Sequence, residues 1–194
     1  MNSKMKRRRV TVLEFALLGL VSQKPRCGYE LIKVFRDTPM AHYSDSPGAI
    51  YPALRRLEAA GLLRGKTERR HELRPRRQFE PTEHGRDELV RWLRQRPNPE
   101  DVARRLDEFM LRFALMDAHL SAAECQAFLE ELERSTVAHL RDLKRYVRSV
   151  EAQMPRHGLL SLQGGVMGCQ TQLRWVRRAL AGYDNKTVRE SRRV

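Results

Sequence analysis

Residues 46–61 bring together side chains that can bind a nucleic acid. Ser46 with Pro47 is a helix-start signal, and Gly61 is a helix-end signal. The outward side of this predicted helix is small, basic and aromatic: it carries Gly48, Pro52, Arg55 and Ala59, with Tyr51 and Arg56 on its flanks. The predicted DNA contacts of the helix are Ser46, Gly48, Tyr51, Pro52, Arg55 and Arg56. Small residues allow close approach to a DNA groove, arginine binds guanine or phosphate, and tyrosine offers a hydroxyl and a ring. The stretch predicts a recognition helix in the DNA major groove, with an ordinary amphipathic helix bearing solvated arginines as the alternative.

The same stretch contains the residues that would hold this helix on a core. Ile50, Leu54 and Leu57 recur at positions i, i+4 and i+7 and form one apolar stripe. Pro52 conflicts with this pattern, because proline removes a backbone donor inside a helix. Either the helix kinks at Pro52, or it begins near Tyr51 with Pro52 as its first residue.

A second basic cluster follows the helix. Two short strands are predicted at 62–68 and 77–80, and positions 64–77 hold seven basic residues against two acidic ones. A hairpin with a basic tip beside a recognition helix is a wing, which reaches phosphates or the adjacent minor groove. A solvated charged loop is the alternative. The predicted wing contacts are Lys66, Arg69, Arg70, Arg76 and Arg77.

Further helices must position these two elements. Helical patterns at 11–21 and 29–37 precede the recognition helix, and Thr82 caps another that covers 83–94. Three helices with short connections, the third of them basic, form the helix-turn-helix layout. A basic arm at 4–9 is expected to lie along phosphates. Prolines at 97 and 99 mark a domain boundary.

The second half is predicted to be helical. One helix starts at Pro99 and keeps an apolar stripe to Leu120. A capping box at Ser121 starts a second helix, which runs to Met154, and a third helix covers 159–183. Such heptad-like seams usually pack on another chain. The predicted dimer contacts are Leu129, Leu132, Leu140, Leu143, Val147, Leu173, Val176 and Leu180. An intramolecular three-helix bundle is the alternative, and the polar tail from 185 is expected to fray.

Three glycines interrupt the last predicted helix. Gly164, Gly165 and Gly168 each weaken it by about 1 kcal/mol relative to alanine. They are therefore expected to permit close backbone approach or contact with a ligand.

Charge is concentrated in the first half of this 194-residue chain. The net charge is +14, and residues 1–96 hold 22 basic and 11 acidic side chains (net +11), whereas residues 97–194 hold 16 and 13 (net +3). This asymmetry is expected when one half binds a polyanion and the other binds protein.

Other chemistries find little support. Cys27, Cys125 and Cys169 stand singly and far apart, so they are expected to be small buried side chains, with a thiol sensor at Cys27 as the alternative. The histidines lie in no triad, metal spacing or phosphate loop, and the aromatic platform of an RNA-binding module is missing. No catalytic residue, metal or cofactor is predicted.

No segment approaches the ~18 apolar residues of a membrane span. The apolar run from Val10 is broken by Glu14 and lacks a cleavage site for a signal peptide. The chain is therefore expected in the cytoplasm.

Several blocks of the sequence resemble those of the PadR-type winged-helix transcriptional regulators. The blocks are LLGLV at 17–21, GYEL at 28–31, SPGAIYPALRRLE at 46–58, GL at 61–62 and FEPTEHG at 79–85. The resemblance covers about residues 10–95. Residues 98–183 look like the long helical C-terminal region of the virulence-activator-like branch.

The resemblance implies a bacterial homodimer, held by its C-terminal helices, that binds a pseudo-palindromic double-stranded DNA operator with one recognition helix per half-site. Many members are repressors released by small, often aromatic ligands held between the helical region and the winged domain. The resemblance also favours a recognition helix that starts near Pro47 and tolerates Pro52. Phe79 stands where the family usually has tyrosine, and Pro81 replaces the usual leucine, so the second strand is expected to end early.

These patterns predict a mainly α protein. It has an α+β winged helix-turn-helix DNA-binding domain at 1–96, a C-terminal all-helical dimerisation and effector domain at 97–184, and a polar tail at 185–194. The predicted function is that of a dimeric, sequence-specific DNA-binding regulator, a ligand-responsive repressor with a small aromatic effector. The alternative is a dimeric nucleic-acid-associated adaptor or activator with no small-molecule ligand.

Overall fold

The computed structural model describes residues 8–44, 46–68, 76–102 and 104–191. The chain forms two compact units, Met1–Trp92 and Leu93–Val194. It is mainly α with one small antiparallel sheet, which confirms the predicted fold class. None of the helices in the described part of the chain combines the length and the apolarity that a bilayer crossing requires.

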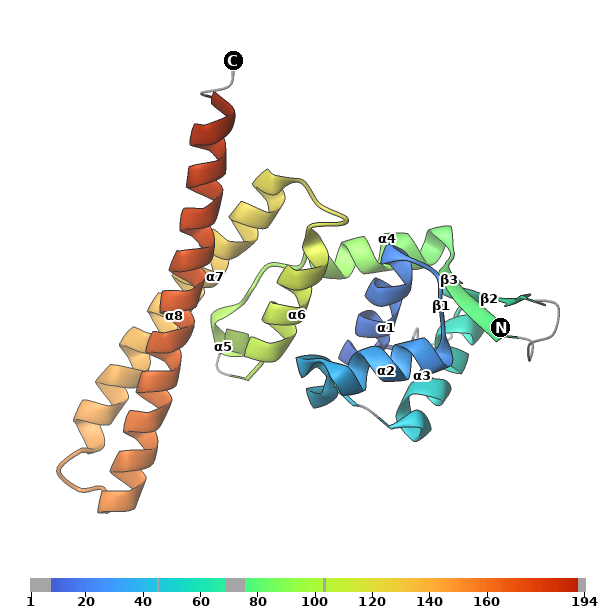
Figure 1. The fold of residues 1–194 in the computed structure, drawn as a ribbon. Helices are drawn as coiled ribbons and strands as arrows, with labels where there is room; N and C mark the ends of the chain where they lie inside the picture. Colours follow the sequence, from blue (N-terminus) through green and yellow to red (C-terminus); the bar gives the residue numbers. More distant parts are fainter. Residues whose placement is uncertain (1–7, 45, 69–75, 103, 192–194) are drawn as a thin grey trace, which may run out of the picture. The chain divides into compact units, whose positions relative to one another are not determined.

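The first unit packs helices around a small sheet (Figure 1). Its elements in chain order are α1 (Val12–Gln23), β1 (Arg26–Cys27), α2 (Gly28–Asp37), the 3-10 helix η1 (Pro39–His42), α3 (Pro47–Ala59), β2 (Leu63–Glu68), β3 (Arg76–Pro81) and α4 (Glu83–Leu93). The sheet has the order β1-β3-β2, and both strand pairs are antiparallel. The sequence does not predict β1 and η1, because a two-residue strand and a single turn leave no periodic pattern.

α1 is the central helix of the first unit. It is buried at every position from Glu14 to Val21. Thr11 caps it through a capping box with Glu14, in which the carboxylate accepts the Thr11 N–H at 2.9 Å. Phe15 stacks on Trp92 of α4 with ring centroids 4.4 Å apart. α1 thus supplies the surface against which α3 packs.

α3 begins at Pro47, so the alternative start beside Pro52 is wrong. The hydroxyl oxygen of Ser46, the N-cap, accepts the N–H of Gly48 at 3.2 Å. Pro52 lies inside the helix and cannot donate to the Gly48 carbonyl, which typically costs about 3 kcal/mol. Burial of the apolar stripe offsets this, at about 1.5–3 kcal/mol per side chain. Its members are at most 1% exposed: Ile50, Leu54 and Leu57.

Hydrogen bonds join the end of α3 to the residues on either side of the wing. The wing comprises β2, β3 and their connection. Gly61 has φ +69°, as the helix-end signal predicts, and its N–H donates to the Glu58 carbonyl at 2.8 Å. The Leu62 N–H donates to the Leu57 carbonyl at 2.9 Å, which completes a Schellman motif. The Leu62 carbonyl in turn accepts the N–H of Thr82, the first residue after the wing, at 3.1 Å.

β3 runs through Pro81, so the expectation that it ends early is wrong. Pro81 lies opposite Leu63, and the neighbouring hydrogen bond is made by Thr82. Since hydrogen-bonded and non-hydrogen-bonded pairs alternate along an antiparallel ladder, the Pro81 nitrogen points away from β2. β1 pairs only with Gln78 and Phe79, so no partner strand needs an N–H from residue 81.

The second unit is helical. Its elements are α5 (Pro99–Val102), α6 (Leu106–Met116), α7 (Ala122–Val150) and α8 (Arg156–Ser191). The single helix expected from Pro99 to Leu120 is therefore two helices, and spacing alone cannot separate these cases because both keep the apolar stripe. The capping box at Ser121 is confirmed. α8 continues to Ser191, so the fraying expected from residue 185 is wrong over that range.

α7 and α8 lie side by side as a helical hairpin (Figure 1). Much of the heptad-like seam is buried inside this hairpin and its surroundings, at Leu129, Leu132, Leu140, Leu173 and Val176. The remaining predicted dimer residues, Leu143, Val147 and Leu180, are half-buried. The seam residues thus pack within one chain, and their contact with a second copy stays a prediction.

The glycines of α8 face open space. A Cβ at Gly164 or Gly168 would meet no atom within 4 Å, and one at Gly165 would only touch Leu143 at 3.9 Å. The close backbone approach expected from them is therefore absent among the described residues. Leu160 and Met167 beside them are 53% and 66% exposed, so this side of α8 is apolar and uncovered.

One cation is buried in the second unit. Arg112 on α6 is 2% exposed and donates to the carbonyl oxygens of Leu93, at 2.9 Å, and of Gln95. Its guanidinium lies 4.9 Å from the ring centroid of Phe128 and 5.8 Å from that of Phe109. Burial lowers the pKa of Arg112 to about 10, so the side chain stays charged at neutral pH.

Candidate nucleic-acid interface

The predicted outward face of α3 is present on the surface of the first unit. Ser46, Gly48, Tyr51 and Arg55 are exposed, and Pro52 is half-buried. No hydrogen-bond or ion-pair partner engages Arg55 within the described ranges. This arginine is thus available to an external acceptor.

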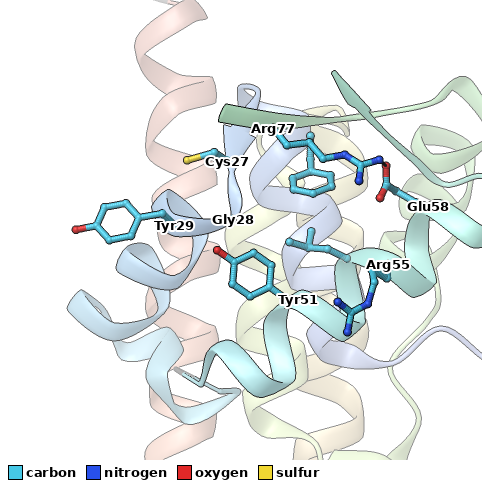
Figure 2. A pocket seen from close by; sticks show the side chains of 9 residues that line it. Cys27, Gly28, Tyr29, Tyr51, Arg55, Glu58 and Arg77 are labelled. Carbon is cyan, nitrogen blue, oxygen red and sulfur yellow. Dashed lines mark hydrogen bonds and ion pairs between the residues drawn. The ribbon is translucent and has the colours of Figure 1, made fainter. Parts of the chain in front are cut away.

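A cavity of about 580 Å³ lies next to this face (Figure 2). It is lined from β1, α2, α3 and β3 by Cys27, Gly28, Tyr29, Tyr51, Leu54, Arg55, Glu58, Arg77 and Phe79. Figure 2 shows the Tyr51 ring beside Gly28, with Arg77 and Glu58 on the opposite side. A Cβ at residue 28 would lie 2.5 Å from Cε1 of Tyr51, so glycine there lets the hydroxyl end of the tyrosine ring approach the start of α2 closely. The cavity wall therefore holds Tyr51 in place beside Arg55.

The described basic residues of the wing form ion pairs at the surface. Lys66 and Arg64 lie 2.7 and 2.6 Å from Glu80, and these two hydrogen bonds lower the pKa of the Glu80 carboxyl. Arg77 lies 2.7 Å from Glu58 and over the Phe79 ring. Surface pairs of this kind contribute little to stability and are screened by salt. A DNA phosphate can therefore replace either glutamate as the partner.

Arg56 is also exposed, with 43% of its side chain accessible, but unlike Arg55 it has an ion-pair partner among the described residues. Its Nε lies 2.7 Å from Oε1 of Glu14, whose side chain is fully buried. Arg8 lies 2.7 Å from the same oxygen, and the Thr11 N–H donates to the other oxygen. Burial raises the pKa of Glu14, but the hydrogen bonds from Thr11, Arg8 and Arg56 outweigh it, so the pKa lies below its usual value. Glu14 is therefore an ionised carboxylate shared by two arginines.

Sequence reasoning misses this ion-pair cluster. Glu14 stands out only as an acid in an apolar run, where it also argues against a signal peptide. The spacing Thr11-x-x-Glu14 is a capping-box signal and could have placed the acid at the start of a helix. Its pairing with Arg56, 42 positions along the chain, has no local signature.

The remaining predicted wing contacts are Arg69, Arg70 and Arg76. Arg69 and Arg70 lie outside the described residues. Arg76 begins β3, and its side chain lies outside what the structure describes.

Alternative chemistries gain no support from the described residues. They contain no cluster of His, Cys, Asp or Glu side chains suited to a metal ion. Cys27, Cys125 and Cys169 are all buried and free, and burial raises the pKa of the Cys125 and Cys169 thiols. Burial of Cys27 argues against the thiol-sensor alternative.

The chain matches two family models. Residues 17–91 match "Transcriptional regulator PadR-like family", and residues 107–184 match "Virulence activator alpha C-term". A curated relative, the negative transcriptional regulator PadR of Bacillus subtilis (strain 168), is 31% identical over 134 residues, which are 69% of this chain and 71% of that protein.

Two solved structures of Bacillus subtilis PadR are also similar. The complex with operator DNA is 26% identical, covers 91% of this chain and 99% of that one, and has a TM-score of 0.43. The complex with p-coumaric acid is 26% identical, covers 90% and 99%, and has a TM-score of 0.39.

Proposed function

This chain belongs to the PadR-like family of transcriptional regulators, and from that premise we propose that it is a homodimeric, ligand-responsive repressor that binds a pseudo-palindromic operator. The observation that carries the DNA part is the exposed face of α3, where Arg55 has no partner among the described residues, beside a wing whose described cations form exchangeable surface pairs. Repression is supported by the curated relative, which is named a negative regulator. It would act in the cytoplasm, where the operator is accessible.

A small aromatic effector is part of the proposal. It is supported by the relative that was solved with p-coumaric acid. The second candidate is an activator without a small-molecule ligand, and the match of the second unit to a virulence-activator family model favours it. Footprinting of the purified protein on genomic fragments, followed by transcription in vitro from the protected promoter, separates the two. If the protein lowers transcription and aromatic acids restore it, the repressor is supported. If the protein raises transcription, the activator is supported.

Sequence discrimination should depend on Arg55. Arg55→Ala removes an exposed guanidinium from α3, and a bidentate contact with a base contributes about 1–3 kcal/mol of discrimination. The difference in binding free energy between operator and scrambled duplex should shrink by that amount in fluorescence-anisotropy titrations.

Arg91→Ala is the matched control for Arg55→Ala. It removes the same charge from α4, where Arg91 pairs with Glu88. It should leave the ratio unchanged. If Arg55→Ala kept the wild-type ratio of operator to scrambled-duplex affinity, α3 would not discriminate DNA sequences through Arg55.

The second copy is proposed to pack on the open side of α8. That side carries the exposed Leu160 and Met167, and Gly164 and Gly168 leave room for close approach of a helix. The buried seam residues would then support the interface from behind, and the half-buried Leu143, Val147 and Leu180 would lie nearer its edge.

Met167→Asp should convert the dimer into a folded monomer. Met167 is 66% exposed, so a carboxylate there leaves the packing within one chain intact but places a charge in the proposed interface. Operator affinity should fall about 100-fold or more, because two linked half-sites no longer bind together. Light scattering after size exclusion measures the mass, and circular dichroism measures the fold.

Val137→Asp on α7 is the matched control, since Val137 is 42% exposed. It should remain dimeric. If Val137→Asp were monomeric and Met167→Asp still dimeric, the dimer interface would lie on α7 instead of α8.

A further inference from the structure

Arg55 and Arg56, which are consecutive on α3, differ in their ion-pair partners. Arg55 is unpartnered within the described ranges, whereas Arg56 lies 2.7 Å from the Glu14 carboxylate. Glu14 belongs to α1, so this contact joins the proposed recognition helix to the central helix of the unit. The same oxygen binds Arg8, from the basic segment that precedes α1, at 2.7 Å. One buried charge thus holds cations from two basic segments.

The glutamates near the proposed DNA face differ in burial, and this decides which cations are available. The side chains of Glu58 and Glu80 are 20% and 22% exposed, so water can solvate either carboxylate when its arginine or lysine moves to a phosphate. The Glu14 side chain has no exposed surface. If Arg56 moved to a phosphate, a buried carboxylate would lose one of its two cations with no water to replace it, which is far costlier than breaking a surface pair. Arg56 and Arg8 therefore stay bound while Arg64, Lys66 and Arg77 exchange.

We propose that Glu14 withholds Arg56 and Arg8 from DNA and makes Arg56 a positioning residue that fixes α3 on α1. This rests on the DNA-binding function proposed above. Two fewer cations then contact phosphates, which lowers affinity for random DNA and for the operator alike, because phosphate contacts carry no sequence information. The preference for the operator then depends on the fixed position of α3 on α1. Glu14 is thereby a determinant of specificity that never touches DNA.

Glu14→Gln tests the proposal directly. Glutamine has the same shape and can still accept the Thr11 N–H, but it no longer binds two cations. Affinity for a random duplex is titrated at three salt concentrations. The slope of log affinity against log salt should become steeper by about one to two, as each newly neutralised phosphate adds about 0.9. Random-duplex affinity should rise, and the operator-to-random ratio should fall because Arg56 no longer fixes α3 on α1.

Glu58→Gln is the matched control. It removes one negative charge near the same face, but its partner Arg77 is already exchangeable. Its slope should equal that of the wild type. An equal steepening in both variants would show a general effect of charge and overturn the proposal, as would a folded Glu14→Gln with the wild-type slope. A merely structural role for Glu14 would weaken binding rather than steepen its salt dependence.

Arg56→Ala and Arg55→Ala give an independent comparison should Glu14→Gln fail to fold. Loss of Arg55 should flatten the slope by about one or reduce the operator-to-random ratio, whereas loss of Arg56 should leave the random-duplex slope unchanged. A slope flattened by about one in Arg56→Ala would show that Arg56 contacts a phosphate and would overturn the proposal. If the wild type itself bound DNA without salt dependence, the DNA-binding function would fail instead, and the two failures are distinguishable.

Discussion

Operator affinity should fall by at least about 1,000-fold when monovalent salt is raised from 50 to 200 mM. Each neutralised phosphate contributes about −0.9 to the slope of log affinity against log salt, so six cations contribute about −5 for each chain of the proposed dimer. The cations counted are Arg55, Lys66, Arg69, Arg70, Arg76 and Arg77. Arg56 is left out, because it is bound to the buried Glu14. Anisotropy titrations of an operator duplex at several salt concentrations measure the slope.

Lys66→Ala provides the control for this measurement. Lys66 pairs only with the surface acid Glu80 among its described contacts, so it can move to a phosphate. Its loss should flatten the slope by about one and weaken binding to operator and scrambled duplex alike. A decrease of less than tenfold in wild-type affinity across the same salt range would mean that the basic face and the wing do not bind the DNA backbone.

Arg112→Ala should destabilise the second unit by about 3–5 kcal/mol. The substitution leaves the carbonyl oxygens of Leu93 and Gln95 without their buried donor and opens a void between the rings of Phe109 and Phe128. Urea unfolding followed by circular dichroism measures the loss as a lower midpoint at a similar m-value.

Arg134→Ala is the comparison variant for Arg112→Ala. It removes the same charge from α7, where Arg134 pairs with Glu131 at the surface. Its unfolding midpoint should stay near that of the wild type. Equal midpoints for the two variants would show that the buried guanidinium is not a major contributor to stability.

The sequence predicts the helix that carries the proposed interface because the signals are local. Ser46, Pro47 and Gly61 define the two ends of α3 through hydrogen bonds within a few residues, and the i, i+4, i+7 stripe defines its buried side. The family resemblance, which is confirmed, adds the tolerance of Pro52. The conflict at that proline is resolved by burial of the stripe, whose size cannot be read from spacing alone.

The contacts that the sequence does not predict are those between distant positions. Glu14 and Arg56 meet only because α1 and α3 pack together, and Arg112 reaches the last residue of α4 and the segment after it only in the folded second unit. The break between α5 and α6 is missed for another reason, since Val102 and Phe109 are both buried and keep the same period. Pattern reasoning finds faces and ends of helices, whereas charge partners depend on tertiary packing.

The bonded junction between α3 and the wing has a consequence for how operator preference can change. Leu62 accepts from Thr82 and donates to Leu57, and a Cβ at Gly85 would lie 2.0 Å from the Leu62 carbonyl oxygen. We therefore expect that grafting the whole block 46–85 from a relative transfers that relative's operator preference. A graft of α3 alone would instead separate the helix from the glycine and threonine that set its angle to the wing. New specificities in such regulators should therefore arise more readily by exchange of the block than by shuffling its helix and hairpin separately.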